Sequence, residues 1–295
     1  MRNLVFVIDE KNDYSRHLGV TLASALKNSN VKWKVFIIHL TLLGENKKRL
    51  KEIADEYDSE IKFIGLKDED FSLLKMREDT YISKVTYARL MIPELLKEES
   101  KGLYLDCDMV VLKPLEVLYD EELEEVSIGA IPDGNYDQTS SKKRLGLDEK
   151  IEYFNAGLLL MDLDRLRKNK KFDEVLEFAK TTKNNLELFD QDALNIIFQG
   201  NYKVLPEIYN VTHGVLLEKN YSLSQIGVIH YTGSVKPWDA RCLHKFRKAY
   251  LEYLKYTPWK GYKLDNQSIL NTIKRELTFF KLSTRNLRYK IKNLK

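Results

Sequence analysis

The 295-residue sequence has only two cysteines, Cys107 and Cys242, six prolines and no long hydrophobic run. Two cysteines cannot form a disulfide framework, so they favour a reducing, cytosolic location. No stretch approaches the ~20 apolar residues of a membrane-spanning helix. The apolar stretch 4–8 is too short for the core of a secretory signal, and Asp9 and Glu10 end it. These features predict a protein that is soluble or peripheral to a membrane.

The sequence also lacks the most easily recognised nucleotide-binding and catalytic signatures. It contains no G-x-G-x-x-G pattern, no P-loop, no Cys/His zinc spacing and no serine nucleophile elbow. With 43% apolar and 31% charged residues, the chain is neither disordered nor collagen-like. Its length suits one large domain or two small ones.

Charge is distributed unevenly along the chain. The formal net charge is +4, but residues 260–295 carry a net charge of +8 and residues 1–259 a net charge of −4. Apolar residues recur at helical spacing in the basic segment, at Ile269, Ile273 and Leu277. We expect 260–295 to be a basic amphipathic tail that binds an anionic membrane surface. A packed or solvated terminal helix is the main alternative, and nucleic acid is a less favoured partner.

Short β-rich runs alternate with helical patterns over the first third of the sequence. Strands are expected at 4–8, 33–40, 61–66 and 102–105, and helices at 18–27, 45–57 and 84–96. This order predicts an α/β fold whose sheet is mostly parallel, with helices on both faces and a ligand beyond the carboxyl ends of the strands. Later strands are expected at 127–131, 154–160, 202–205 and 227–231, and helices at 172–180 and 192–198. A boundary near Pro258–Gly261 would divide a domain of residues 1–259 from the tail at 260–295.

Two carboxylates follow the apolar run 103–105. The i, i+2 spacing of Asp106 and Asp108 places both on one face of an extended chain, whereas Cys107 points to the other. Such a pair at the end of a strand can hold Mn²⁺ or Mg²⁺ against a diphosphate. Taken alone, the pattern is also typical of a turn that ends a strand.

A second candidate group follows the run 228–231. His230 can complete a metal site with two aspartates. Gly233 would let the backbone approach a phosphate closely, and Lys236 would supply a positive charge to it. The alternative interpretation is a histidine at a strand end, a turn glycine and a solvated lysine.

Amide and carboxylate side chains form a third group, with Asn155 in one motif and Asp190 and Gln191 in another. These side chains bind sugar hydroxyls, and one of them near an anomeric carbon can stabilise positive charge there. The run Asp190-Gln191-Asp192 also suits the first turn of a helix.

In this order the motifs resemble glycosyltransferase family 8, in particular its bacterial lipopolysaccharide galactosyltransferases and glucosyltransferases. The similarity spans about residues 3–250 and is carried by six runs, 6–9 with 12–14, 86–90, 104–108, 154–157, 190–195 and 230–238. The resemblance implies a GT-A fold and a metal-dependent, retaining transfer of galactose or glucose from a UDP-sugar. The acceptor would be a hydroxyl of a glycan or a lipid-linked glycan.

The resemblance also implies roles for individual residues. The metal ligands would be Asp106, Asp108 and His230. Donor contacts would come from Asp9, Asn12, Tyr14, Ile82, Arg89, Asp106, Cys107, Asp108, Gly233 and Lys236. The reaction centre would contain Gln191, Asp190, Arg89 and Asn155, with Gln191 beneath the anomeric carbon. The acceptor cleft would be lined by Tyr81, Asp133, Leu188 and Thr232.

Gln191 is a poor nucleophile, so we expect the acceptor hydroxyl to attack on the same face rather than through a covalent intermediate. Two alternatives to this enzyme stay open. One is a self-glucosylating primer protein of the glycogenin type, and the other is a UDP-sugar-binding protein without turnover. The expected location is the cytoplasm, at the inner face of the membrane if the tail binds lipid.

Overall fold

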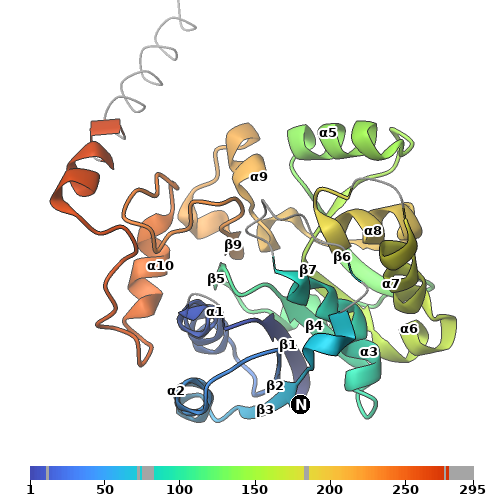
Figure 1. The fold of residues 1–295 in the computed structure, drawn as a ribbon, viewed down its shortest axis with the longest axis horizontal. Coiled ribbons are helices and arrows are strands. Elements are labelled where there is room, and N and C mark those ends of the chain that lie inside the picture. The colour runs from blue at the N-terminus through green and yellow to red at the C-terminus, as the bar shows by residue number, and fades with distance from the viewer. Residues whose placement is uncertain (11–12, 72–73, 75–82, 183–185, 276, 279–295) are drawn as a thin grey trace, which may run out of the picture.

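The computed structural model describes residues 1–10, 13–71, 74, 83–182, 186–275 and 277–278, and it is a layered α/β structure (Figure 1). The main sheet of the described chain has seven strands in the order β3-β2-β1-β4-β7-β6-β8. Their bounds are β1 Arg2–Ile8, β2 Trp33–His39, β3 Glu60–Gly65, β4 Lys101–Leu105, β6 Ile128–Pro132, β7 Phe154–Asp162 and β8 Lys203–Val204.

Strands β1 to β4 run parallel, as the sequence predicts, but β7 reverses the direction. It pairs antiparallel with β4, where Leu105 lies opposite Leu158, and antiparallel with β6. Strand β8 is parallel to β6. The sheet is therefore mixed and mostly parallel. A second, two-stranded sheet joins β5 (Met109–Val111) to β9 (Val228–His230) in antiparallel register.

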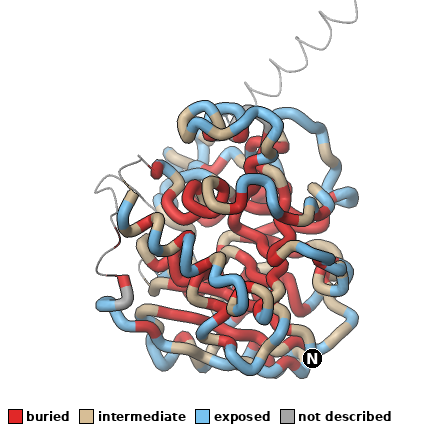
Figure 2. The backbone as a smooth tube through the Cα atoms, turned by 90° about the vertical axis from the view of Figure 1, so that its right-hand side faces the viewer, coloured by how far each residue is buried: buried red, intermediate tan, exposed pale blue. Residues whose placement is uncertain are grey.

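Both faces of the main sheet are buried, because successive side chains of a strand point to opposite faces. In β1, Leu4, Phe6 and Ile8 belong to one apolar cluster, and Val5 and Val7 belong to the other. Helices α1 (Ser15–Lys27) and α2 (Gly44–Glu56) cover the first cluster, and α7 (Lys171–Thr181) and α8 (Phe189–Phe198) cover the second. Figure 2 shows buried backbone through the interior of this layered body.

The remaining helical segments of the described chain are mostly short. The α-helices are α3 Ile92–Leu95, α4 Glu116–Tyr119, α5 Asn135–Leu145, α6 Leu163–Asn169, α9 His213–Glu218 and α10 Arg247–Leu254. The 3₁₀ segments are η2 Asp68–Phe71, η3 Lys84–Met91, η4 Glu207–Tyr209 and η5 Leu223–Gln225.

The helix expected at 84–96 is observed as a helical segment over 84–95, but not as one α-helix. The segment is the 3₁₀ helix η3 followed by one turn of α3, in which Pro93 lies at the start. Proline has no backbone N–H to donate to the preceding turn and it clashes with that turn, so an α-helix cannot run through the position unbroken. The sequence analysis also missed α5, whose residues are almost all polar and show no helical hydrophobic period.

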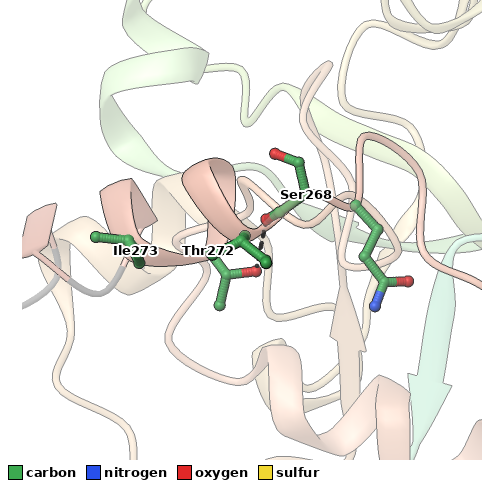
Figure 3. A pocket seen from close by; sticks show the side chains of 5 residues that line it. Ser268, Thr272 and Ile273 are labelled. Carbon is green, nitrogen blue, oxygen red and sulfur yellow. Dashed lines mark hydrogen bonds between the residues drawn. The ribbon is translucent and has the colours of Figure 1, made fainter.

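Beyond residue 268 the described chain projects away from the body as a short helix (Figure 1). In the described part of the chain, four apolar residues of this segment are exposed, namely Ile269, Leu270, Ile273 and Leu277. Residues 267–269, 272 and 273 line a hollow of about 360 Å³, where Thr272 donates a hydrogen bond to the carbonyl of Ser268 at 3.0 Å (Figure 3). The hollow is lined by no charged side chain. No described helix combines the length and apolar character that a membrane crossing requires.

Candidate functional site

Asp106, Asp108 and His230 meet beyond the carboxyl end of β4. Asp106 directly follows β4, Asp108 directly precedes β5, and His230 ends β9. The pairing of Met109 with His230 in the small sheet places the imidazole beside the carboxylates. His230 Nε2 lies 3.3 Å from Asp108 Oδ1 and 3.7 Å from Asp106 Oδ2. One ligand atom from each of the three residues lies within 4.8 Å of the others.

A chain of hydrogen bonds fixes which nitrogen of His230 faces the carboxylates. The backbone N–H of Gly157 donates to Asn155 Oδ1, which also accepts from Asn210 Nδ2, both at 3.0 Å. Asn210 Oδ1 must therefore face His230 Nδ1, at 2.9 Å. Because an amide oxygen only accepts, Nδ1 carries the proton, and in the neutral ring Nε2 keeps its lone pair.

This donor set suits a divalent cation. Two carboxylates and an imidazole lone pair that converge on one point are typical metal ligands, and the hydrogen bond to the other ring nitrogen is a common second-sphere contact. Gly157 makes room for the cluster, because a Cβ there would lie 2.4 Å from His230 Cε1 and 2.8 Å from Asp106 Oδ2. The absence of a side chain at Gly157 thus lets His230 and Asp106 pack closely against the backbone, and a larger residue there would displace them.

Lys236 provides positive charge at the same place. Its Nζ lies 2.6 Å from Asp108 Oδ2 and donates to the carbonyl of Tyr231 at 2.8 Å. Burial alone would raise the pKa of Asp108, but the ammonium group of Lys236, together with His230 when its ring is protonated, outweighs burial and holds this pKa well below its usual range. Asp108 is therefore ionised at neutral pH.

Asp106, Asp108 and His230 are called the cation cluster here, because they could hold a cation. Arg89 links this cluster to Asp190. Its guanidinium lies 3.1 Å from Asp106 Oδ1 and 2.9 Å from Asp190 Oδ2, and it also donates to the carbonyls of Thr86 and Ala156. Burial opposes the charged form of Arg89, yet the two carboxylates raise its pKa. With its donors committed in this way, Arg89 holds the two aspartates in place.

Gln191 is oriented by hydrogen bonds on both sides of its amide. Its Oε1 accepts from the backbone N–H of Ala156 at 2.9 Å, and its Nε2 donates to the hydroxyl of Tyr153 at 3.3 Å. That hydroxyl donates to Asp192, which is fully buried and forms a two-bond pair with Arg144 at 2.8 and 2.9 Å. The amide group of Gln191 is thus fixed from the core outward.

Backbone strain occurs where α8 begins. Phe189 has φ of +46°, in the left-handed region that a bulky residue rarely adopts. Such strain costs about 1–3 kcal/mol and is common at functional sites. Here it lies next to Asp190 and Gln191. Burial raises the pKa of Asp190, although Arg89 opposes the effect.

Asp133 lies at the far end of the hydrogen-bond chain that reaches His230. Its Oδ2 accepts from Asn155 Nδ2 and its Oδ1 from the hydroxyl of Thr212, both at 3.4 Å. The residue is buried, and it also accepts from the N–H of Gly134. The structure therefore brings Asp133 to the same network as the cation cluster.

Three residues expected on the donor side lie near the loops that follow β1 and β9. Asp9 accepts hydrogen bonds from the hydroxyls of Thr41 and Ser83, at 3.1 and 2.9 Å. Tyr14 precedes α1 and meets the ring of Trp238 edge-on at 5.5 Å between centroids. Gly233 has φ of +89°, a conformation that favours glycine.

Three more residues expected at the site, Cys107, Leu188 and Thr232, make the following contacts. The Cys107 thiol is buried and donates to the carbonyl of Val7 at 3.2 Å, so it points away from the cation cluster, as the strand alternation predicts. Leu188 precedes α8, and its N–H donates to Asp192. Thr232 accepts from the N–H of His213 at 3.3 Å. The three expected site residues Asn12, Tyr81 and Ile82 lie outside the described residues.

A model of Glycosyl transferase family 8 matches residues 3–242, which is most of the chain. The chain belongs to glycosyltransferase family 8. The resemblance seen in the sequence motifs is thereby confirmed.

Two related proteins match most of this chain. General stress protein A of Bacillus subtilis is 28% identical over 267 residues, which is 84% of this chain and 92% of that protein. The lipopolysaccharide 1,2-glucosyltransferase of Escherichia coli K12 is 25% identical over 270 residues, covering 88% of this chain and 79% of that enzyme.

The solved structure of the galactosyltransferase LgtC with donor and acceptor sugar analogs is also similar to this chain. It superposes with a TM-score of 0.78 at 25% identity, covering 88% of this chain and 99% of LgtC. A second LgtC structure carries a glutamine-to-glutamate change in its active site. The predicted α/β fold of the GT-A type, with its mixed and mostly parallel sheet, is confirmed.

The sequence analysis missed three residues that hold side chains of the candidate site in place. Asn210 is fully buried in an irregular segment after η4 and has no motif around it. Gly157 belongs to the motif 154–157, but the sequence does not indicate which side chains pack against this glycine. The partner of Asp192, Arg144, comes from the unpredicted helix α5.

Proposed function

We propose that this protein is a retaining hexosyltransferase that moves galactose or glucose from a UDP-sugar to a hydroxyl of a glycan or lipid-linked glycan. The observation that carries the proposal is the convergence of Asp106, Asp108 and the His230 lone pair beside Lys236. Membership of family 8 supports it, and so does the similarity to LgtC, which was solved with donor and acceptor sugar analogs.

The cation would be Mn²⁺ or Mg²⁺ and would be held by Asp106, Asp108 and His230. When bound, it would neutralise negative charge on the diphosphate leaving group. Lys236 adds a point charge at the same end of the donor. Asp9 and Tyr14 would contact the uridine, and Gly233 would let the backbone come close to the phosphates.

Gln191 and Asp190 would face the anomeric carbon as it acquires positive charge, and Asn155 is linked through Asn210 to His230. An amide held by Ala156 and Tyr153 is a poor nucleophile, so we propose attack by the acceptor hydroxyl on the face that the diphosphate leaves. Asp133, Leu188 and Thr232 would lie on the acceptor side. A trapped glycosyl group on Asp190 or Gln191 would contradict this mechanism.

A panel of nucleotide sugars tests the proposed function. With Mn²⁺ and no acceptor, we expect slow hydrolysis of UDP-galactose or UDP-glucose and no hydrolysis of GDP-mannose. EDTA should abolish the reaction, and added Mn²⁺ should restore it. NMR of the first sugar released should show the α configuration of the donor. UDP-sugar binding without turnover would instead indicate a binding protein, and a mass increase of the enzyme itself would indicate self-glucosylation.

We also propose that the basic tail brings the enzyme to an anionic membrane surface, where a lipid-linked acceptor would lie. Six of its basic residues fall in 281–295, and each contributes about 1 kcal/mol near such a surface. Replacing these six residues with glutamine in the full-length chain should strongly reduce sedimentation with phosphatidylserine-containing liposomes. Liposomes of phosphatidylcholine alone are the control. Equal sedimentation of both chains with the anionic liposomes would exclude the proposed role of the tail.

A further inference from the structure

A segment beyond the family 8 match lies against the loop that carries Lys236. This segment, residues 259–266, is called the strap here, and residues 233–240 are called the donor loop. The family match ends at residue 242, and the mechanism proposed above gives the strap no role. Much of the strap is exposed or half-buried, so it adds little to the apolar core.

The strap is hydrogen-bonded to the donor loop through backbone and side chain. The N–H of Asp265 donates to the carbonyl of Trp238, and the N–H of Ala240 donates to the carbonyl of Asp265, both at 2.9 Å. These two bonds form a short parallel bridge between Asp239 and Asp265. The side-chain amide of Asn266 adds a third bond, to Asp239 Oδ2 at 2.8 Å.

The strap is also anchored on helix α1. The guanidinium of Arg16 stacks over the ring of Tyr262 at 3.5 Å and lies 3.4 Å from Asp265 Oδ1. The Tyr262 hydroxyl donates to the same carboxylate oxygen. Farther along α1, the Trp259 ring lies against Gly19, where an added Cβ would be 2.6 Å from it. The strap is therefore fixed to a helix that packs on the main sheet.

The donor loop itself is held between α1 and the cation cluster. The indole of Trp238 stacks on the buried ring of His17 at 3.5 Å between centroids, with 11° between the planes. Two residues earlier, Lys236 reaches Asp108. Because Trp238 is bonded to the strap through its carbonyl, a shift of the strap would shift the part of the loop next to Lys236.

We propose that the strap is a positioning segment, which holds the donor loop so that Lys236 reaches Asp108 and the diphosphate of a bound nucleotide. The proposal rests on the proposed function, because it concerns the same nucleotide site. The strap itself touches no reacting atom in this scheme, and it acts through Lys236.

The test uses the full-length chain and UDP binding in the presence of Mn²⁺, measured by calorimetry. A double variant, Tyr262→Ala with Asp265→Ala, removes the side-chain anchors on α1 and should weaken UDP binding about tenfold. Asp265→Asn keeps an oxygen that accepts from Arg16 and Tyr262, so it should bind UDP nearly as the parent does. Gln267→Ala changes an exposed neighbour that lies next to the strap and is the matched control.

A cycle with Lys236→Met separates positioning from a general structural role. If the strap acts through Lys236, the double variant should weaken UDP binding much less in the Lys236→Met background than in the parent. An equal loss in both backgrounds, or no loss in the parent background, would overturn the proposal. A parent protein that binds no UDP would instead overturn the proposed function, and the strap proposal with it. Should the double variant not fold, Tyr262→Phe gives the same comparison with an expected loss of about threefold.

Discussion

Replacing Asp108 with asparagine is expected to lower kcat/KM for the UDP-sugar by about 10³-fold, or ~4 kcal/mol of transition-state stabilisation. Asp108 contacts both His230 and Lys236, and its lowered pKa keeps it ionised at neutral pH. An amide has nearly the same shape but no negative charge, so it would weaken cation binding and leave Lys236 without its counterion. The change should therefore act on chemistry more than on folding.

Two measurements accompany this prediction. Mn²⁺ binding, followed by electron paramagnetic resonance, should fall with the activity, and the far-UV circular dichroism should be unchanged. Asp120→Asn is the matched control, because Asp120 pairs with Arg2 on the surface and its side chain is 55% exposed. We expect the control to retain activity within about twofold, since surface ion pairs contribute little. Full activity of Asp108→Asn would remove the proposed cation site.

Substituting Gly157 with alanine should damage the site as severely by a different route. The added Cβ would lie 2.4 Å from His230 Cε1, 2.8 Å from Asp106 Oδ2 and 3.0 Å from Asn155 Oδ1. The His230 ring and the Asp106 carboxylate must move and Asn155 must give slightly. Asn155 and His230 are also tied to each other through Asn210. We expect loss of Mn²⁺ binding and of activity, together with a drop of about 1–3 kcal/mol in the free energy of unfolding, which is typical of overpacking.

Gly44→Ala is the matched control for this prediction. Gly44 is the first residue of α2, and an added Cβ meets nothing within 4 Å. Replacing a glycine in an unstrained helical conformation stabilises a protein by about 0.4–1 kcal/mol, so the control should unfold at the same or a higher urea concentration. If Gly157→Ala bound Mn²⁺ as the parent does, the close packing around His230 would not matter for the cation.

Most of the sheet could be predicted because its central strands carry continuous apolar runs. The strand expected at 4–8 is observed at Arg2–Ile8, and the strand expected at 154–160 is observed at Phe154–Asp162. A strand that is buried on both faces needs such a run. The antiparallel direction of β7 could not be predicted, because an apolar run is compatible with parallel and with antiparallel pairing.

The chemistry-bearing residues could be predicted because six motifs occur together in the order that resembles family 8, although each motif taken alone has an ordinary structural explanation. Asp106, Asp108, His230 and Lys236 lie together, although more than 100 residues separate the two pairs in the sequence. Their supports could not be predicted. Asn210 holds His230 through geometry that only the folded backbone defines.

Because β7 is antiparallel to β4, the start of one strand and the end of the other lie together at the site. In a wholly parallel sheet, only the ends of strands open onto the ligand side. Here the beginning of β7 lies beside the end of β4, since Leu158 is opposite Leu105 and the N–H of Asp106 donates to the carbonyl of Gly157 at 2.8 Å. One outgoing and one incoming strand therefore share a single rim. That rim brings the carboxylates that follow β4 next to the first residues of β7, where the backbone N–H groups of Ala156 and Gly157 hold the side chains of Gln191 and Asn155.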